Sequence, residues 1–209
     1  MEYTLSSKEV TYLIHKAPYL AKLFNHVGSL KTQLERNHFK FLVYTILGQQ
    51  ISVKQADNVF NRLLMLTNNT LDATTLSSIS KDQLKSIKIP EFKIKYLNAL
   101  IQAEQRNHFN LSHLQQLSHP KRIKHLTKIT GIGVWSAEMF CMFVLGEEDL
   151  FSFTDKGLQN ALRKYLNKPD ITLIEMREIA QQWEPYKSIV AHYLWSYWDN
   201  PKEKGESNG

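Results

Sequence analysis

Apolar residues recur with helical spacing along most of the chain. Between polar breaks they fall three and four positions apart, which places them on one face of a helix. Three breaks carry the capping-box pattern, a serine or threonine followed three residues later by glutamine or glutamate, at Ser52, Ser80 and Thr172. Pro90 and Pro120 suit the first turns of two further helices. No stretch shows the period-two alternation of a strand. The pattern predicts an all-α fold of about ten helices.

Individual helices can be placed from this periodicity. They are predicted over residues 38–49, 134–145, 156–166, 173–183 and 186–198. The segment 134–145 is apolar on nearly every side, so it should form a buried central helix ending near Gly146. The polar stretch 200–209 is expected to be a frayed tail.

Composition and charge narrow the class of protein. The 209 residues are 43% hydrophobic, enough for one large domain or two small lobes. The chain has 26 Lys and Arg residues against 20 Asp and Glu residues. This excess of positive charge suits a polyanionic partner such as nucleic acid or an anionic membrane surface. No segment reads as a secretory signal or a membrane span. The single cysteine, Cys141, excludes an intrachain disulfide and a four-cysteine metal or cluster site, and it fits the reducing cytoplasm.

Two glycines mark the most informative segment, residues 126–137. Gly131 and Gly133 flank Ile132 between two predicted helices, so the connection can be very tight and anchored by Ile132 in the core. Backbone amides at the start of the second helix could hold a phosphate. A basic run precedes the turn, formed by Lys121, Arg122, Lys124 and Lys128. From these residues alone, phosphate binding and an ordinary turn both remain open.

Asp155 stands at the start of the predicted helix 156–166. An aspartate in that position is most often a simple helix cap. Without its sequence neighbours, Asp155 is therefore better explained as a helix cap than as a catalytic residue.

The two features together resemble a known family. Gly-Ile-Gly-Val-Trp-Ser-Ala-Glu-Met-Phe begins at Gly131, and Asp155 follows Gly133 by 22 residues within Phe-Ser-Phe-Thr-Asp-Lys-Gly-Leu. This order and spacing resemble the helix–hairpin–helix DNA glycosylase superfamily, with the strongest likeness to DNA-3-methyladenine glycosylase II, the alkylated-base enzymes. Ile46-Leu-Gly-Gln-Gln-Ile-Ser-Val-Lys and Trp183-Glu-Pro-Tyr-Lys-Ser, the latter continuing to Tyr193-Leu-Trp195, supply two further matching blocks. The likeness runs from about Lys40 to Trp195.

The resemblance implies an architecture. Residues 30–146 would form one helical lobe that ends with the hairpin motif. Residues 1–29 and 147–199 would form a second lobe that carries Asp155 at the junction, with DNA crossing between the lobes. No iron–sulfur cluster is expected, because the cluster of relatives such as endonuclease III needs four cysteines.

The resemblance also implies a chemistry. Asp155 would be the catalytic carboxylate that stabilises an oxocarbenium-like sugar and orients or deprotonates the attacking water. Bifunctional relatives carry a lysine two residues after the second hairpin glycine, where it forms a Schiff base with the sugar. Trp135 occupies that position here. The implied enzyme is therefore monofunctional and leaves an abasic site.

Further site residues follow from the same likeness. Trp135 and Trp195 match the aromatic residues of the base pocket. Ordinary core packing is the alternative for both tryptophans. Met139 stands where an aromatic residue is more usual in the family. Gln50 matches the wedge that fills the gap left by a flipped base. The carbonyls of Thr127, Ile129 and Ile132 would hold a monovalent cation, Na⁺ or K⁺, when DNA is bound; Thr130 replaces the usual proline.

These inferences predict a monomeric DNA glycosylase of base excision repair. It would excise alkylated purines of the 3-methyladenine and 7-methylguanine type from double-stranded DNA. The expected location is the cytoplasm, at the nucleoid if the source is bacterial, and no membrane partner is expected. A glycosylase for another lesion and a non-enzymatic helix–hairpin–helix DNA-binding protein are the alternatives. Five lysines, at positions 81, 85, 88, 93 and 95, could line the DNA track or form a solvated face.

Overall fold

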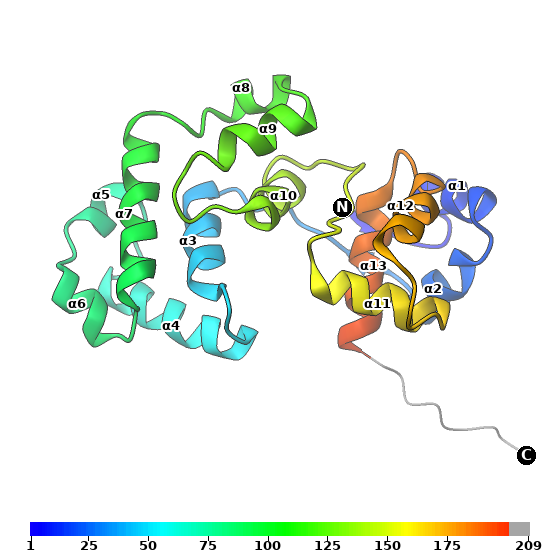
Figure 1. Cartoon of the computed structure of the whole chain (residues 1–209), viewed down its shortest axis with the longest axis horizontal. Helices are drawn as coiled ribbons and strands as arrows, with labels where there is room; N and C mark the ends of the chain where they lie inside the picture. The colour runs from blue at the N-terminus through cyan, green and yellow to red at the C-terminus, as the bar shows by residue number, and fades with distance from the viewer. Residues whose placement is uncertain (201–209) are drawn as a thin grey trace, which may run out of the picture. The chain divides into compact units, whose positions relative to one another are not determined.

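The computed structural model describes residues 1–200, which are helical over most of their length (Figure 1). These residues form thirteen helices and one pair of two-residue strands, so the prediction of an all-α fold is confirmed. The predicted frayed tail lies, apart from Asn200, outside the described residues. Within residues 1–200, every helix is too short or too polar to cross a lipid bilayer.

The chain divides into two compact units. The first, called here the hairpin unit, runs from Leu34 to Gly146. Its helices are α3 (His38–Gly48), α4 (Val53–Leu66), α5 (Ala73–Ser77), α6 (Lys81–Ser86), α7 (Glu91–Gln105), α8 (Leu111–Gln116), α9 (His119–Leu126) and α10 (Val134–Phe143).

The second, called here the aspartate unit, joins Met1–Gln33 to the chain from Glu147 onward. It contains β1 (Glu2–Tyr3), α1 (Lys8–Lys16), α2 (Leu20–Val27), β2 (Leu30–Lys31), α11 (Lys156–Leu166), α12 (Leu173–Gln181) and α13 (Lys187–Asp199). Antiparallel pairing of β2 with β1 keeps residues 30–33 with this unit, so the observed boundary falls slightly later than residue 30.

Local sequence signals account for most helix starts. Ser52, Ser80 and Thr172 all form the expected capping boxes, in which the side chains of the cap and of the third helical residue each accept a backbone hydrogen bond. Pro90 is the N-cap of α7, and Pro120 lies in the first turn of α9. Helix ends were harder to predict. Helix α10 stops at Phe143 because the chain turns towards Gly146, whose φ is +71°.

Each unit has its own core. In the hairpin unit, α3 packs against α4, α7 and α10, and the contact faces of α3 and α10 are fully buried at Leu42, Val43, Ile46, Ala137 and Phe140. In the aspartate unit, α13 packs against α2 and α11. Tyr193 of α13 is buried there and donates its hydroxyl to the carbonyls of Tyr3 and Gly28, at 3.2 and 3.1 Å.

Candidate functional site

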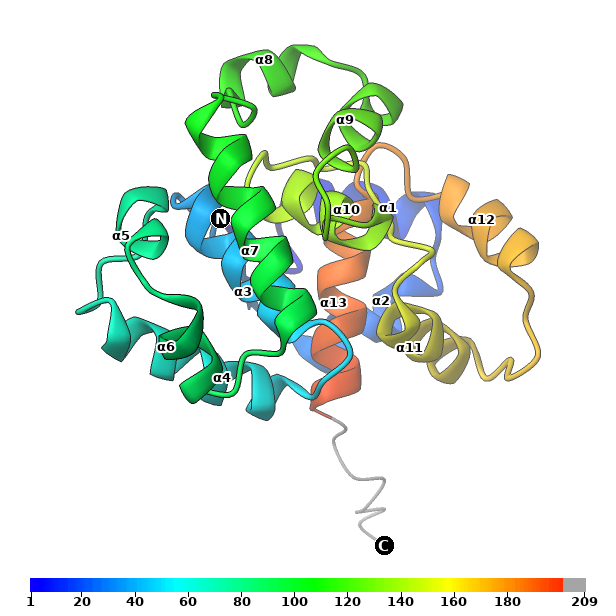
Figure 2. The same ribbon diagram turned by 60° about the vertical axis from the view of Figure 1, so that its left-hand side comes forward.

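The glycine hairpin joins α9 to α10, which pack against each other (Figure 2). Ile132 is 4% exposed, and its amide donates to the carbonyl of Ile129 at 3.0 Å, which closes the turn. The predicted anchoring of the hairpin by Ile132 is thus observed. Gly133 is the N-cap of α10 and has no side chain with which to cap the helix. A helix start of this kind presents backbone amides to an anion.

Gly131 and Gly133 have different structural requirements. Gly131 has a φ of +97°, and a Cβ there would overlap the ring of Tyr96 on α7. Its carbonyl accepts a hydrogen bond from Gln49 Nε2 at 2.8 Å. Gly133 has an ordinary φ of −86°, and a Cβ added there would meet no atom within 4 Å. Glycine is therefore required by the fold at 131, whereas at 133 it leaves an open approach to the backbone.

The basic run before the hairpin is only partly exposed. Lys121, Lys124 and Lys128 are exposed. Arg122 instead donates from Nε to the carbonyl of Leu114 at 3.0 Å and from Nη2 to that of Gln115 at 3.4 Å. Because these carbonyls lie at the end of α8, the guanidinium stabilises that helix end. The lysines, and not Arg122, are the cations of this run that face solvent.

An apolar hollow of about 450 Å³ lies beside the hairpin within the same unit. It brings together two residues predicted for the base pocket, Trp135 and Met139, which are one turn apart on α10. Trp135 is 37% exposed and Met139 is 4% exposed. The rest of the lining comes from α3, α4 and the turn between them: Phe41, Tyr44, Thr45, Gly48, Ile51, Val53, Ala56 and, from the end of α10, Phe143. This volume and lining suit a flat organic group.

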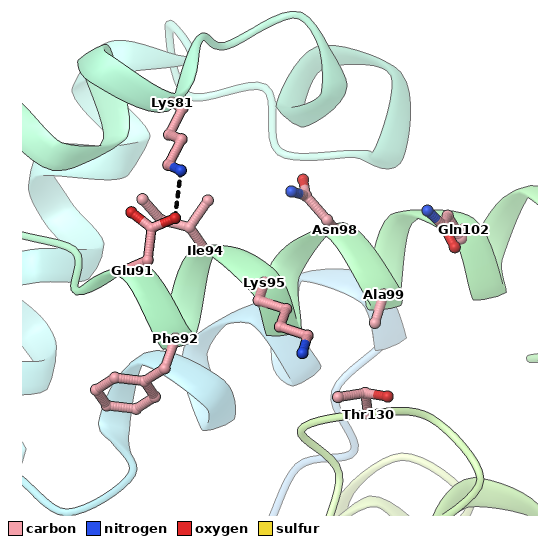
Figure 3. A pocket seen from close by; sticks show the side chains of 9 residues that line it. All are labelled: Lys81, Glu91, Phe92, Ile94, Lys95, Asn98, Ala99, Gln102 and Thr130. Atoms are coloured by element: carbon pink, nitrogen blue, oxygen red, sulfur yellow. Dashed lines mark ion pairs between the residues drawn. The ribbon is translucent and has the colours of Figure 1, made fainter.

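A second, more polar hollow of about 740 Å³ follows α7 (Figure 3). Phe92, Lys95 and Asn98 line it, and Thr130 of the hairpin turn lies across from α7. Lys81 forms an ion pair with Glu91 at one end, and Lys85 pairs with the same carboxylate at 2.9 Å. Exposed pairs of this kind contribute little to stability.

The turn after α3 carries the predicted wedge residue. Gln50 is exposed and has a φ of +62°. Gln49 is half-buried and bonded to the hairpin, so it is not the solvated loop residue that the sequence also allowed. Lys93 is 3% exposed and donates to two carbonyls of this turn, so it belongs neither to a DNA track nor to a solvated face. Sequence alone missed this role, since a lysine in a basic stretch carries no sign of burial.

Asp155 lies in the aspartate unit as the N-cap of α11. Its Oδ1 accepts from the amide of Leu158 at 2.7 Å, and its own amide donates to the carbonyl of Ser152 at 3.2 Å. The ordinary capping role is therefore present. A Cβ placed on Gly157 would lie 3.0 Å from Asp155 Oδ1 and 3.9 Å from Trp195 Nε1. Asp155 and Trp195 are thus neighbours across a residue with no side chain.

Ser188 of α13 fixes the segment that leads to Asp155. Its Oγ accepts from the amide of Leu150 at 3.1 Å and donates to the carbonyl of Glu147 at 2.6 Å. Its amide donates to the carbonyl of Glu148 at 2.8 Å. These bonds hold the start of the 147–155 segment against α13. In the sequence, a serine near the start of a predicted helix did not identify these partners.

His192 lies one turn before Trp195 on α13, and their rings meet edge to face with centroids 5.7 Å apart. Burial disfavours the charged imidazolium and lowers the pKa of His192 to about 4. At neutral pH this imidazole is therefore uncharged.

The carbonyls predicted to bind a cation have the ligand chemistry that an alkali ion needs. The oxygen of Ile129 accepts one hydrogen bond, from Ile132, and a carbonyl oxygen has a second lone pair. Backbone carbonyls are neutral, hard ligands that suit an alkali cation and not a soft metal. The cation site at the carbonyls of Thr127, Ile129 and Ile132 stays a prediction.

Comparisons with known proteins agree with this geometry. No family model matches the chain. YfjP of Bacillus subtilis is 25% identical over 184 residues, which are 84% of this chain and 64% of YfjP, so the chain spans just under two thirds of that relative. DNA-3-methyladenine glycosylase 1 of Schizosaccharomyces pombe is 24% identical, with 84% of this chain and 79% of that protein covered.

A solved structure shows that the likeness extends to the fold of the whole chain. The crystal structure of a Bacillus halodurans DNA-3-methyladenine glycosidase superposes with a TM-score of 0.85 at 26% identity, over 98% of this chain and 95% of that one. The proteins to which this chain is similar are DNA-3-methyladenine glycosylases, and its structural neighbours are glycosylases of the helix–hairpin–helix superfamily. Its relatives there are alkylated-base glycosylases, so the resemblance inferred from the three sequence blocks is confirmed.

The two hairpin glycines should respond differently to alanine. Gly131→Ala must adopt a positive φ and displace Tyr96, so it should lower the free energy of unfolding by about 1–3 kcal/mol. Gly133→Ala should change it by less than about 0.5 kcal/mol. Urea unfolding of both variants measures this. Equal losses would contradict the distinction.

Acid should destabilise the fold through His192. Below pH 6.5 the unfolded chain binds a proton that the folded imidazole does not take up until about pH 4, so acid favours unfolding in this range. Between pH 7 and 5 this group should remove about 2 kcal/mol from the free energy of unfolding. His192→Gln, which does not titrate there, should have a correspondingly flatter pH profile in urea unfolding. Identical profiles for the two proteins would refute the assignment.

Proposed function

We propose that this protein is a monofunctional DNA glycosylase that excises alkylated purines from double-stranded DNA. The observation that carries the proposal is Trp135, whose partly exposed side chain lines the apolar hollow two residues beyond Gly133. Bifunctional relatives carry their Schiff-base lysine at this position. An indole has no amine with which to form that adduct, so hydrolysis is the available route.

The hollow suits an alkylated purine. A purine methylated at a ring nitrogen carries positive charge, which an electron-rich indole face attracts through cation–π interaction. The flipped base would lie against Trp135, with Met139 beneath it. Charge and stacking would then select the damaged base without a large set of hydrogen bonds. In the aspartate unit, Trp195 lies beside Asp155 and offers a further indole ring.

Asp155 is proposed as the catalytic carboxylate. The bond to the amide of Leu158 fixes one carboxylate oxygen, so the group is oriented before the substrate binds. Loss of a cationic base leaves an electron-poor sugar, which a fixed anion stabilises as the charge develops. The same carboxylate can orient or deprotonate the attacking water. Because an alkylated purine is already a good leaving group, the mechanism needs no strong acid.

The hairpin is proposed to grip the DNA backbone. The start of α10, whose N-cap is Gly133, would offer amides to one phosphate, and Lys121, Lys124 and Lys128 add positive charge. A Na⁺ or K⁺ ion on the carbonyls of the turn that ends at Ile132 would bridge to the backbone when DNA is bound. Gln50 would enter the duplex and fill the space left by the flipped nucleotide. The enzyme would act as a monomer wherever cellular DNA lies, which in a bacterium is the cytoplasm.

Asp155→Asn separates catalysis from helix capping. Asparagine caps helices about as well as aspartate, so the unfolding midpoint should stay near that of the wild type. The single-turnover excision rate should fall by at least about 10²-fold, because the preorganised charge is lost. Asp155→Ala should in addition lower the free energy of unfolding by about 0.5–2 kcal/mol. Excision by Asp155→Asn at nearly the wild-type rate would exclude this role.

Duplexes with single defined lesions distinguish the candidate functions. We expect release of 3-methyladenine and 7-methylguanine, with strand breaks only after alkali treatment of the abasic product. Breaks without alkali would contradict the monofunctional assignment. Preferential release of an oxidised or mismatched base would indicate another lesion class. Tight DNA binding without release of any base would indicate a non-enzymatic DNA-binding protein.

A further inference from the structure

The turn that carries Gln50 is held in an unfavourable conformation. Helix α3 ends at Gly48, and Gln50 follows with a φ of +62°, in the left-handed region that residues with a side chain seldom adopt. Such a backbone is energetically unfavourable and persists only where its surroundings fix it. Gln50 is itself exposed, so its own side chain does not provide that support.

Lys93 provides support from beneath the turn. Its Nζ donates to the carbonyl of Leu47 at 2.5 Å and to that of Gln49 at 2.9 Å. Both acceptors lie at the carboxyl end of α3, where the helix dipole favours a cation. Among the described residues, no carboxylate forms an ion pair with Lys93. Lys93 is 3% exposed, and burial lowers its pKa because the charged amine is removed from water.

Gln49 links the same turn to the hairpin. Its carbonyl accepts from Lys93, while its side-chain amide donates to the carbonyl of Gly131 at 2.8 Å. Tyr96, one turn after Lys93 on α7, packs against Gly131. One face of α7 therefore contacts both the turn that carries Gln50 and the glycine of the hairpin.

We propose that Lys93 is a positioning residue for base flipping, which fixes the Gln50 turn and joins it to the hairpin through Gln49. The inference rests on the proposed function, in which Gln50 is the wedge. Unstacking and unpairing a base opposes insertion of the wedge. If the turn moved instead, the wedge would enter the duplex less often. A turn held at two carbonyls stays in place, so binding energy from the hairpin can be used to insert the wedge. Lys93 does this without touching DNA, since it is buried.

The test compares one lesion in two pairing states. Excision of 7-methylguanine is measured in single turnover, first opposite cytosine and then opposite an abasic-site analogue, where no pairing opposes flipping. Lys93→Met keeps the length and burial of the side chain and removes both hydrogen bonds. The excision rate of this variant should fall roughly 10-fold or more when the lesion is paired with cytosine. The rate should fall less than about 3-fold when the lesion is unpaired. Lys8→Met removes the same charge from an exposed side chain, which pairs with Glu9, and should resemble the wild type on both substrates.

A merely structural lysine would give a different result. Equal losses on the two substrates, or no loss in folded Lys93→Met, would overturn the inference. Lys93→Arg, which retains charged donors, should recover part of the paired-lesion rate. If Lys93→Met melts below the assay temperature, Gln49→Met must show the same dependence on pairing, and its failure to do so would also overturn the inference. Failure of the wild type to release either base would instead refute the proposed function.

Discussion

The hairpin unit depends on the close approach of three segments at Gly131. The ring of Tyr96 occupies the space of a side chain, Gln49 bonds the glycine carbonyl, and the neighbouring Ile132 is buried. Any other residue at this point would separate α7 from the hairpin turn. The short distance lets one helix hold both the turn after α3 and the start of α10, and these two segments border the hollow that contains Trp135.

Three of the structural features assigned to function involve helix ends, where backbone groups lack helical partners. The backbone groups at these three helix ends are treated differently. The start of α10 has Gly133, which has no side chain to bond its amides. The start of α11 is capped by the carboxylate of Asp155, and the end of α3 is bonded by the amine of Lys93. In Asp155, capping and the proposed catalysis are compatible because the cap uses Oδ1 to hold the carboxylate in one orientation.

Local signals in the sequence were enough to predict most of the helices, because caps and apolar periodicity involve residues within a turn or two. The helix 156–166 was predicted at its observed ends, while α1, α2, α5 and α8 were not placed. Long-range roles were not predictable from one sequence. Lys93 reaches a carbonyl 46 residues away, and Ser188 bonds a segment 38 residues away. Arg122 was grouped with the basic run before the hairpin, and its bond to the carbonyl of Leu114 is visible only in the fold.

Met139 bears on how such a pocket would choose its substrate. A thioether is flexible and polarisable, so it can adapt to bases of different outline where a second flat ring would impose one fixed spacing. Trp135, by contrast, presents a rigid face from the start of the same helix. A pocket with one rigid face and one adaptable face discriminates weakly by shape, so the positive charge of the damaged base becomes the main basis of selection. That division of roles explains how an apolar hollow with few polar side chains can still be selective.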